Sequence, residues 1–294
     1  MRAAFAALID YAGLFPPASL SLAQSANEYH AARRGTYSWM LGRFVVPASM
    51  LASDAVLGGP FSVIVEPNAG ALRGVAERRN AGVPVDALEI PLQRSVSPLR
   101  DRLSPDEILD IAGALEADLS VTGLRDVPAF VEIPRARPWQ GMEAQTLATL
   151  ARLGLCGKVR CGGVTADAFP SIEDLAEFVA AAADGRTRFK ATAGLHHPVR
   201  HRDAATGFTM HGFLNLLAAA ALAPRVPIDT LRSILAEEDA AAFQFTDSSF
   251  SWRDRSASVD ELKQLRTDAF VGYGSCSFAE PIEDLTAMGI LPAT

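Results

Sequence analysis

Lysine is rare in this chain, and its few lysines are the residues whose chemistry stands out first. Of the 27 basic side chains among 294 residues, three are lysines, Lys158, Lys190 and Lys263. Arginine stays protonated in proteins, whereas a lysine amine can lose its proton and attack a carbonyl carbon. Lys190 lies inside an apolar run, where partial burial and a neighbouring cation would favour the neutral amine. We therefore expect Lys190 to form a Schiff base with a ketone or aldehyde, and we assign no role to Lys263, on a polar helix.

Charged side chains also occur near the ends of consecutive apolar runs: Glu66, Glu89, Glu132, Arg160 and Lys190. A charge within an apolar strand is costly unless it is paired or lies in a solvated site. We expect Glu132 and Glu89 to transfer protons beside Lys190. Arg160 and Glu66 are expected to bind the substrate, Arg160 through an anionic group. The alternative is a buried layer of ion pairs without a catalytic role.

Four of the five histidines follow closely after the Lys190 run: His196, His197, His201 and His211. Histidine serves both as an acid–base group near neutral pH and as a metal ligand. We expect His196 to transfer protons, and His197 and His211 to bind the substrate. The alternative is a divalent metal ion held by His197, His201 or His211 together with Glu89 or Glu132.

A turn rich in glycine and serine, residues 272–277 (GYGSCS), follows the last apolar run. Backbone N–H groups and hydroxyls in such a turn can hold a phosphate or carboxylate. We therefore expect Ser275 and Ser277 to contact an anionic substrate, with a turn of no function as the alternative.

The elements that must position these residues alternate between apolar runs and amphipathic stretches. The expected strands are 43–47, 61–67, 85–92, 129–134, 158–163, 188–194, 242–246 and 269–274. The expected helices are 48–57, 69–81, 104–117, 141–153, 171–184, 211–223, 258–267 and 282–288. Residues 246–258 are typical of a hairpin or a long loop rather than a helix.

Eight strands, nearly all followed by a helix, predict a (β/α)8 TIM barrel, with a doubly wound open α/β sheet as the alternative. We expect one domain over residues 1–294, with 1–40 as an N-terminal helical extension. In a barrel the carboxyl ends of the strands meet at one mouth, where Lys190 would lie on strand six near Glu132 and Arg160.

The stretch Lys190–Gly194 (KATAG) resembles the Lys-Thr-Ser-Thr-Gly stretch of deoxyribose-phosphate aldolases. These are class I aldolases, TIM barrels that carry their Schiff-base lysine on strand six. The glutamates at the strand ends are also similar to those of type I dehydroquinate dehydratases, another Schiff-base barrel. The resemblance covers five residues and a strand position. It implies a lyase that forms an imine on Lys190 and needs no cofactor.

Composition narrows the classes of protein to be considered. Apolar residues make up 49% of the chain and the net charge is −7, so we expect a globular protein without a nucleic-acid surface. No apolar run is long enough to span a membrane, and three scattered cysteines indicate a reducing, cytoplasmic setting.

The leading prediction is a lyase or aldolase acting on a small anionic carbonyl compound. The alternatives are a metal-dependent hydrolase or lyase, and a non-catalytic barrel that binds an anion or serves as an assembly subunit. The expected partner is a small anionic molecule, and a homo-oligomer is left open.

Overall fold

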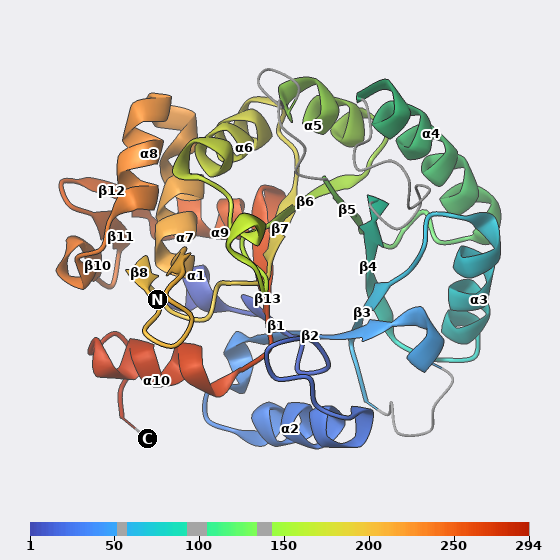
Figure 1. Ribbon diagram of the computed structural model, residues 1–294, viewed down its shortest axis with the longest axis horizontal. Helices are drawn as coiled ribbons and strands as arrows, with labels where there is room; N and C mark the ends of the chain where they lie inside the picture. Colours follow the sequence, from blue (N-terminus) through green and yellow to red (C-terminus); the bar gives the residue numbers. More distant parts are fainter. Residues whose placement is uncertain (52–57, 93–104, 134–142, 294) are drawn as a thin grey trace.

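The computed structural model describes residues 1–51, 58–92, 105–133 and 143–293. Its centre is a closed barrel of eight parallel strands (Figure 1). The strands are β1 (Ile9–Tyr11), β2 (Leu41–Pro47), β3 (Phe61–Ile64), β4 (Val85–Pro91), β5 (Ala129–Glu132), β6 (Cys156–Arg160), β7 (Phe189–Thr192) and β13 (Phe270–Ser275). The barrel closes because β1 pairs with both β2 and β13. The predicted (β/α)8 barrel is confirmed, and the open-sheet alternative is excluded.

The first and seventh strands are not where the sequence pattern placed them. Ile9–Tyr11, within the expected helical extension, is the first barrel strand, and all three residues are buried. The predicted strand 242–246 becomes β10 (Phe243–Phe245), which pairs antiparallel with β11 outside the barrel. The numbering of the barrel strands therefore shifts by one, and Lys190 lies on the seventh strand, not the sixth.

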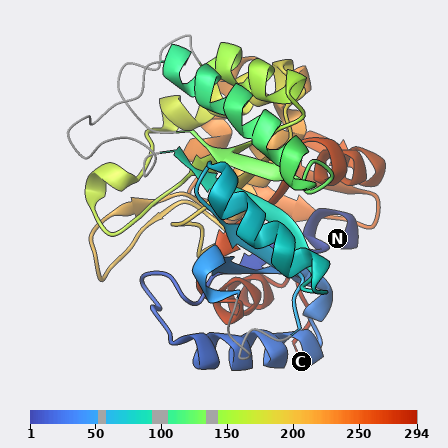
Figure 2. The same cartoon turned by 90° about the vertical axis from the view of Figure 1, so that its right-hand side faces the viewer.

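Helices form a layer around the strands (Figures 1 and 2). They are α1 (Arg2–Phe5), α2 (Leu22–Arg34), α3 (Ala69–Asn80), α4 (Pro105–Thr122), α5 (Glu143–Arg152), α6 (Ile172–Asp184), α7 (Phe213–Leu222), α8 (Ile228–Ala236), α9 (Val259–Asp268) and α10 (Ala279–Ala287). Capping boxes at Ser21, Ser171 and Ser258 fix the starts of α2, α6 and α9, because each serine side chain satisfies an amide of the first helical turn.

Short 3₁₀ turns complete the connections: Ser38–Met40, Ala48–Met50, Ala166–Ala168, Ala223–Arg225 and Ala240–Ala242. The predicted helix 48–57 is a 3₁₀ turn at its start, and 52–57 lie outside the described residues. Helix α2 follows β1 and packs against β2, where the Tyr29 hydroxyl donates to the Gly42 carbonyl. Residues 1–40 thus include the first strand–helix unit of the barrel, and the single-domain assignment stays a prediction.

Two small sheets lie outside the barrel. Strands β10, β11 (Ser249–Trp252) and β12 (Arg255–Ser258) form an antiparallel sheet beside α7 and α8. Its two turns confirm the hairpin expected within 246–258. Strands β8 (His201–Arg202) and β9 (Thr209–Met210) pair within the segment that follows β7.

The apolar core lies mainly between the strands and the helical layer, while the inside of the barrel is partly polar. A small apolar cluster of Ala87, Phe130 and Cys156 lies inside. Two residues further along the same strands, on the same face, stand Glu89, Glu132 and Lys158. The strands therefore change from apolar to charged interior side chains as they approach their carboxyl ends.

Candidate functional site

The interior charges meet at Glu89, at the centre of an ion-pair network. Its carboxylate accepts from Lys158 Nζ and Lys190 Nζ, each at 2.6 Å, and from the Ser62 hydroxyl at 2.7 Å. These partners come from β3, β6 and β7. Lys190 Nζ also lies 5.7 Å from the centre of the Phe130 ring. Because side chains point alternately into and out of the barrel along each strand, these side chains meet at one level inside it.

The network continues in both directions from Glu89. Towards the mouth, Lys158 Nζ lies 2.9 Å from Glu132, which lies 3.8 Å from Arg160. Towards the amino ends of the strands, Lys190 Nζ lies 2.6 Å from Asp10 Oδ2, and Asp10 lies 3.9 Å from Arg43. Arg43 Nε in turn donates to Asp86 at 2.7 Å. The result is a row of alternating charges through the barrel: Asp86, Arg43, Asp10, Lys190, Glu89, Lys158, Glu132 and Arg160.

Burial divides this row into a closed middle and two open ends. The side chains of Lys190, Glu89 and Asp10 are at most 3% exposed. At the mouth the exposure rises to 13% for Glu132 and 46% for Arg160. A ligand at the carboxyl end would therefore meet Glu132 and Arg160 first.

Electrostatics hold the centre of the network in its charged form. Burial alone would raise the pKa of Glu89, but the ion pairs with Lys158 and Lys190 outweigh it and hold that pKa well below its ordinary value. Burial would lower the pKa of Lys158, but Glu132 and Glu89 outweigh it and raise that pKa. Glu89 is therefore ionised across the neutral range and is a poor proton carrier.

The position of Lys190 contradicts its predicted role. The expected neighbour was a cation that would favour the neutral amine, but its Nζ lies between the carboxylates of Asp10 and Glu89. Before Nζ could reach a carbonyl carbon it would have to leave both carboxylates, each 2.6 Å away, and the side chain is only 1% exposed. The interior holds the buried layer of ion pairs that was the alternative from the sequence, whereas the absence of a catalytic role stays a prediction.

Two connections meet at the mouth: the loop after β7, which carries His196, and the segment from β13 into α10, which carries Cys276 and Glu280. Directly after β7, Ala193 and Gly194 have φ angles of 59° and 68°, which turn the chain sharply. His196 Nδ1 then lies 3.1 Å from Glu280 Oε2, and both ring nitrogens lie 3.9 Å from Cys276 Sγ. Burial raises the pKa of the Cys276 thiol, so the sulfur stays protonated. The predicted proton transfer by His196 stays a prediction.

The other histidines do not converge on one point. His197 Nδ1 lies 2.7 Å from Asp284, and its ring packs edge-on against His201. His211 is buried, with Nε2 2.8 Å from the Pro170 carbonyl oxygen, to which it must donate. Within the described residues, no three His, Cys, Asp or Glu side chains are placed to hold a metal ion. The substrate roles expected for His197 and His211 stay predictions.

The serine turn after β13 is occupied by its own contacts. Ser275 is buried and its hydroxyl accepts from the Ser277 amide, while the Ser277 hydroxyl accepts from the Glu280 amide. Glu280 adds a negative charge at the start of α10. The amides of Ser277 and Glu280 therefore form their hydrogen bonds within the turn. Glu66 follows β3 and is half-buried; its substrate role stays a prediction.

Sequence reasoning missed several members of the network: Asp10, Arg43, Ser62 and Asp86, with Lys158 noticed but given no role. A usable signal existed for Asp10, because it interrupts a short apolar run just as Glu89 does. Arg43 lies at the edge of its expected strand, where a charge is ordinary. Ser62 is a small polar residue that no pattern distinguishes.

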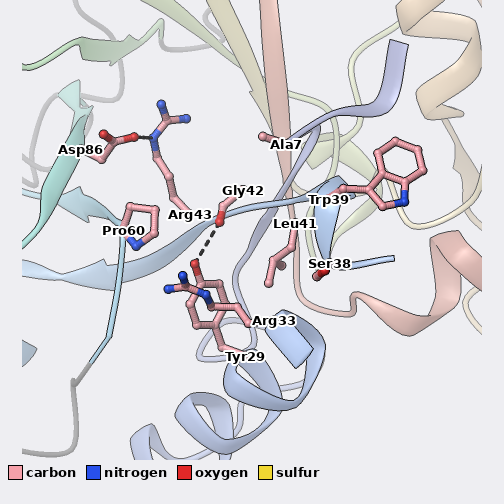
Figure 3. Close-up of a pocket in the computed structure, with 10 residues that line it drawn as sticks. All are labelled: Ala7, Tyr29, Arg33, Ser38, Trp39, Leu41, Gly42, Arg43, Pro60 and Asp86. Carbon is pink, nitrogen blue, oxygen red and sulfur yellow. Dashed lines mark hydrogen bonds and ion pairs between the residues drawn. The ribbon is translucent and has the colours of Figure 1, made fainter. Parts of the chain in front are cut away.

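A cavity of about 380 Å³ lies at the opposite end of the barrel from the mouth (Figure 3). Its lining comes from the starts of β2 and β4, from α2 and from neighbouring loop residues. Arg43 and Asp86 belong to this lining, so the cavity and the ion-pair row share two residues. No candidate from the sequence lies there.

Comparison with known proteins assigns no family to this chain. No family model and no curated protein matches it. Similar solved structures include mandelate oxidase with (S)-2-phenylpropionate, at 16% identity and a TM-score of 0.38, over 80% of this chain and 76% of that chain. A mandelate oxidase variant with benzaldehyde has 15% identity and a TM-score of 0.38, over 80% of this chain and 76% of that chain. A mandelate oxidase variant with the C4a-OH-FMN adduct has 14% identity and a TM-score of 0.39, over 97% of this chain and 74% of that chain.

These findings correct the predicted function. The Schiff-base lyase is wrong: Lys190 lies on the seventh strand, not the sixth, and its Nζ is held by two carboxylates. The aldolase-like stretch therefore lacks both the strand position and the free amine. The sequence predicted no cofactor, with a divalent metal ion as the alternative; one similar structure instead holds an FMN adduct, which is a property of that oxidase.

The turn after β13 is poorly suited to the phosphate of FMN. The amides of Ser277 and Glu280 already donate within the turn after β13, and the Glu280 carboxylate would repel a phosphate there. These two amides are therefore not available to a phosphate group, and the turn does not fit FMN. The (β/α)8 barrel is established by the strand pairing of this chain itself.

Proposed function

We propose that this protein is an enzyme that binds a small anionic molecule at the carboxyl end of its barrel and moves a proton with Glu132. The observation that carries the proposal is the loosening of the ion-pair row at the mouth. Interior contacts of 2.6 Å give way to 3.8 Å between Arg160 and Glu132, where the side chains also become exposed. Arg160, whose side chain is 46% exposed, is thereby accessible to a molecule that binds at the mouth.

Arg160 is suited to hold the anionic group. Its Nε donates to the Gly162 carbonyl at 2.9 Å, which fixes the direction of the guanidinium while nearly half of the side chain stays exposed. A planar guanidinium can pair with a carboxylate or phosphate through two parallel hydrogen bonds. The long contact with Glu132 is one that a bound anion can replace.

Glu132 is suited to accept a proton from the bound molecule. It ends β5, and its carboxylate accepts from Lys158, which the network keeps protonated. This contact orients the carboxylate and leaves it at the rim, where it can approach a C–H or O–H group beside the anionic end of the substrate. The supported chemistry is general acid–base catalysis on a small carboxylate or phosphate ester.

Hydrogen exchange tests this without knowledge of the natural substrate. The purified full chain is incubated in D₂O with small 2-hydroxy and 2-oxo carboxylates and phosphate esters, and loss of C–H signals is followed by ¹H NMR. We expect exchange with at least one compound. Glu132→Gln should slow it about 100- to 10,000-fold, and Arg160→Gln should raise the half-saturating concentration about 10- to 100-fold.

Matched controls separate the site from general charge effects. Glu77→Gln and Arg78→Gln alter exposed residues of α3 and should leave exchange unchanged. Urea unfolding of Glu132→Gln shows whether the variant is folded. Saturable binding of the anions without any exchange would overturn the catalytic proposal in favour of a binding barrel. Unchanged exchange in a folded Glu132→Gln would overturn the role of Glu132.

A further inference from the structure

The cavity at the amino end of the barrel has the composition of a ligand site. Its volume of about 380 Å³ falls in the range of small-molecule pockets. The charged residues that line it are Arg33, Arg43 and Asp86. Asp86 is already paired with Arg43, so the second arginine leaves the lining with an excess of positive charge.

The two guanidinium groups are held in place before any ligand arrives. Arg43 Nε donates to Asp86 at 2.7 Å, and Arg43 Nη1 lies 3.9 Å from Asp10. Arg33 donates to the carbonyls of Gly58 and Gly59 and lies over the Tyr29 ring, 6.0 Å from its centre. Figure 3 shows both arginines beside the strand that carries Gly42. Guanidinium groups fixed in this way lose little side-chain freedom when they bind an anion.

The rest of the lining is suited to a ring. Trp39 lies at one side of the cavity, across from Arg43 and Asp86 in Figure 3, with Leu41 between them. The Arg2 guanidinium lies over the Trp39 ring, 5.2 Å from its centre, and Leu41 is buried, so the face of Trp39 away from Arg2 supplies the apolar surface. Aromatic and aliphatic side chains opposite charged ones are the usual pattern for ligands with one apolar and one charged part.

We propose that this cavity is a second ligand site, separate from the mouth, for a small molecule that carries an aromatic ring and one carboxylate or phosphate group. Arg33 and Arg43 hold the anionic group, and the ring packs on Trp39. This inference does not depend on the acid–base role of Glu132, because none of the lining residues lies at the carboxyl end of the barrel.

Tryptophan fluorescence provides a direct test, with phenyl phosphate as the probe and the purified full chain. Saturable quenching is expected at millimolar or lower concentrations, and the quenching should disappear in Trp39→Phe while binding persists by calorimetry. Arg33→Gln should weaken binding about 10- to 100-fold, the usual effect of losing a charge-assisted hydrogen bond. Arg34→Gln, the next residue of α2, is exposed and outside the lining, so it should bind as the parent does.

Two further probes separate the parts of the ligand. Benzyl alcohol keeps the ring without the charge and should not bind measurably, while inorganic phosphate keeps the charge without the ring and should bind more weakly than phenyl phosphate. Absence of saturable binding, equal weakening by Arg34→Gln, or loss of binding in Arg160→Gln would overturn the proposal. The last result would place phenyl phosphate at the mouth.

Discussion

Replacing Glu89 by glutamine tests the ion-pair network most directly. The substitution keeps the volume and the contact with Ser62 but removes a charge that two ammonium groups share. Breaking a buried ion pair costs about 3–5 kcal/mol, because it leaves an uncompensated charge. Lys190 keeps Asp10 and Lys158 keeps Glu132, so we expect the lower end, about 3 kcal/mol of unfolding free energy at pH 7.

Urea unfolding followed by circular dichroism measures this difference. Glu77→Gln, on the exposed face of α3, is the matched control and should change stability by less than about 0.5 kcal/mol. A loss of less than about 1 kcal/mol in Glu89→Gln would refute the reasoning, because the buried ammonium groups would then not depend on Glu89.

The pH dependence identifies charge as the cause. The pKa of Glu89 is depressed in the folded state, so its stabilising contribution is present above the ordinary value of 4.5 and is lost as the pH falls through the folded value. The pKa of Lys158 is raised, so its contribution is present below the ordinary value of 10.5 and is lost as the pH rises through the folded value. The loss of unfolding free energy in Glu89→Gln, relative to the parent protein, should therefore become smaller below pH 4.5. A loss that stays constant from pH 7 to pH 3 would point to packing instead of charge.

Three further predictions concern other parts of the chain. In urea unfolding, Gly194→Ala should destabilise the protein by about 1–3 kcal/mol, because Gly194 has φ 68° and an added Cβ would lie 2.8 Å from the Gly162 Cα. In the same assay Gly74→Ala should stabilise the protein by about 0.5–1 kcal/mol, because Gly74 lies in an open part of α3. Borohydride treatment with small aldehydes and ketones should trap no adduct on Lys190, because its Nζ is held by Asp10 and Glu89. Detection of such an adduct by mass spectrometry would contradict this arrangement. The thiols should react with a disulfide reagent more slowly in the native protein than in urea, since all three cysteines are buried and burial raises the pKa of Cys276; equal rates would contradict that burial.

Local patterns in the sequence predicted most elements but not their membership of the barrel. Residues 242–246 have the composition of a barrel strand, and the structure places Phe243–Phe245 in a separate antiparallel sheet. Ile9–Tyr11 is too short for any periodicity to emerge, and Asp10 makes it look polar. Pairing with distant strands decides both cases, and pairing partners are not encoded in a window of a few residues.

The same limit applies to the candidate site. Side chains alternate in direction along each strand, and this pattern was enough to predict that Glu89, Glu132 and Lys190 point into the barrel. It did not reveal that Asp10 and Glu89 lie 2.6 Å from Lys190 Nζ. Whether a lysine is a nucleophile or half of an ion pair depends on its nearest partners, and Asp10 is 180 residues away along the chain.

Arg43 links the two proposed sites, because it lines the amino-end cavity and also reaches Asp10. An anion bound by Arg43 would compete with Asp10 for the guanidinium, and Asp10 would then rely more on Lys190. Lys190 shares Glu89 with Lys158, which in turn orients Glu132. Any coupling along this row must be reciprocal, since a free energy that links two binding sites is the same seen from either one. A ligand in the cavity that changes affinity at Arg160 must therefore have its own affinity changed, by the same factor, by an anion at the mouth.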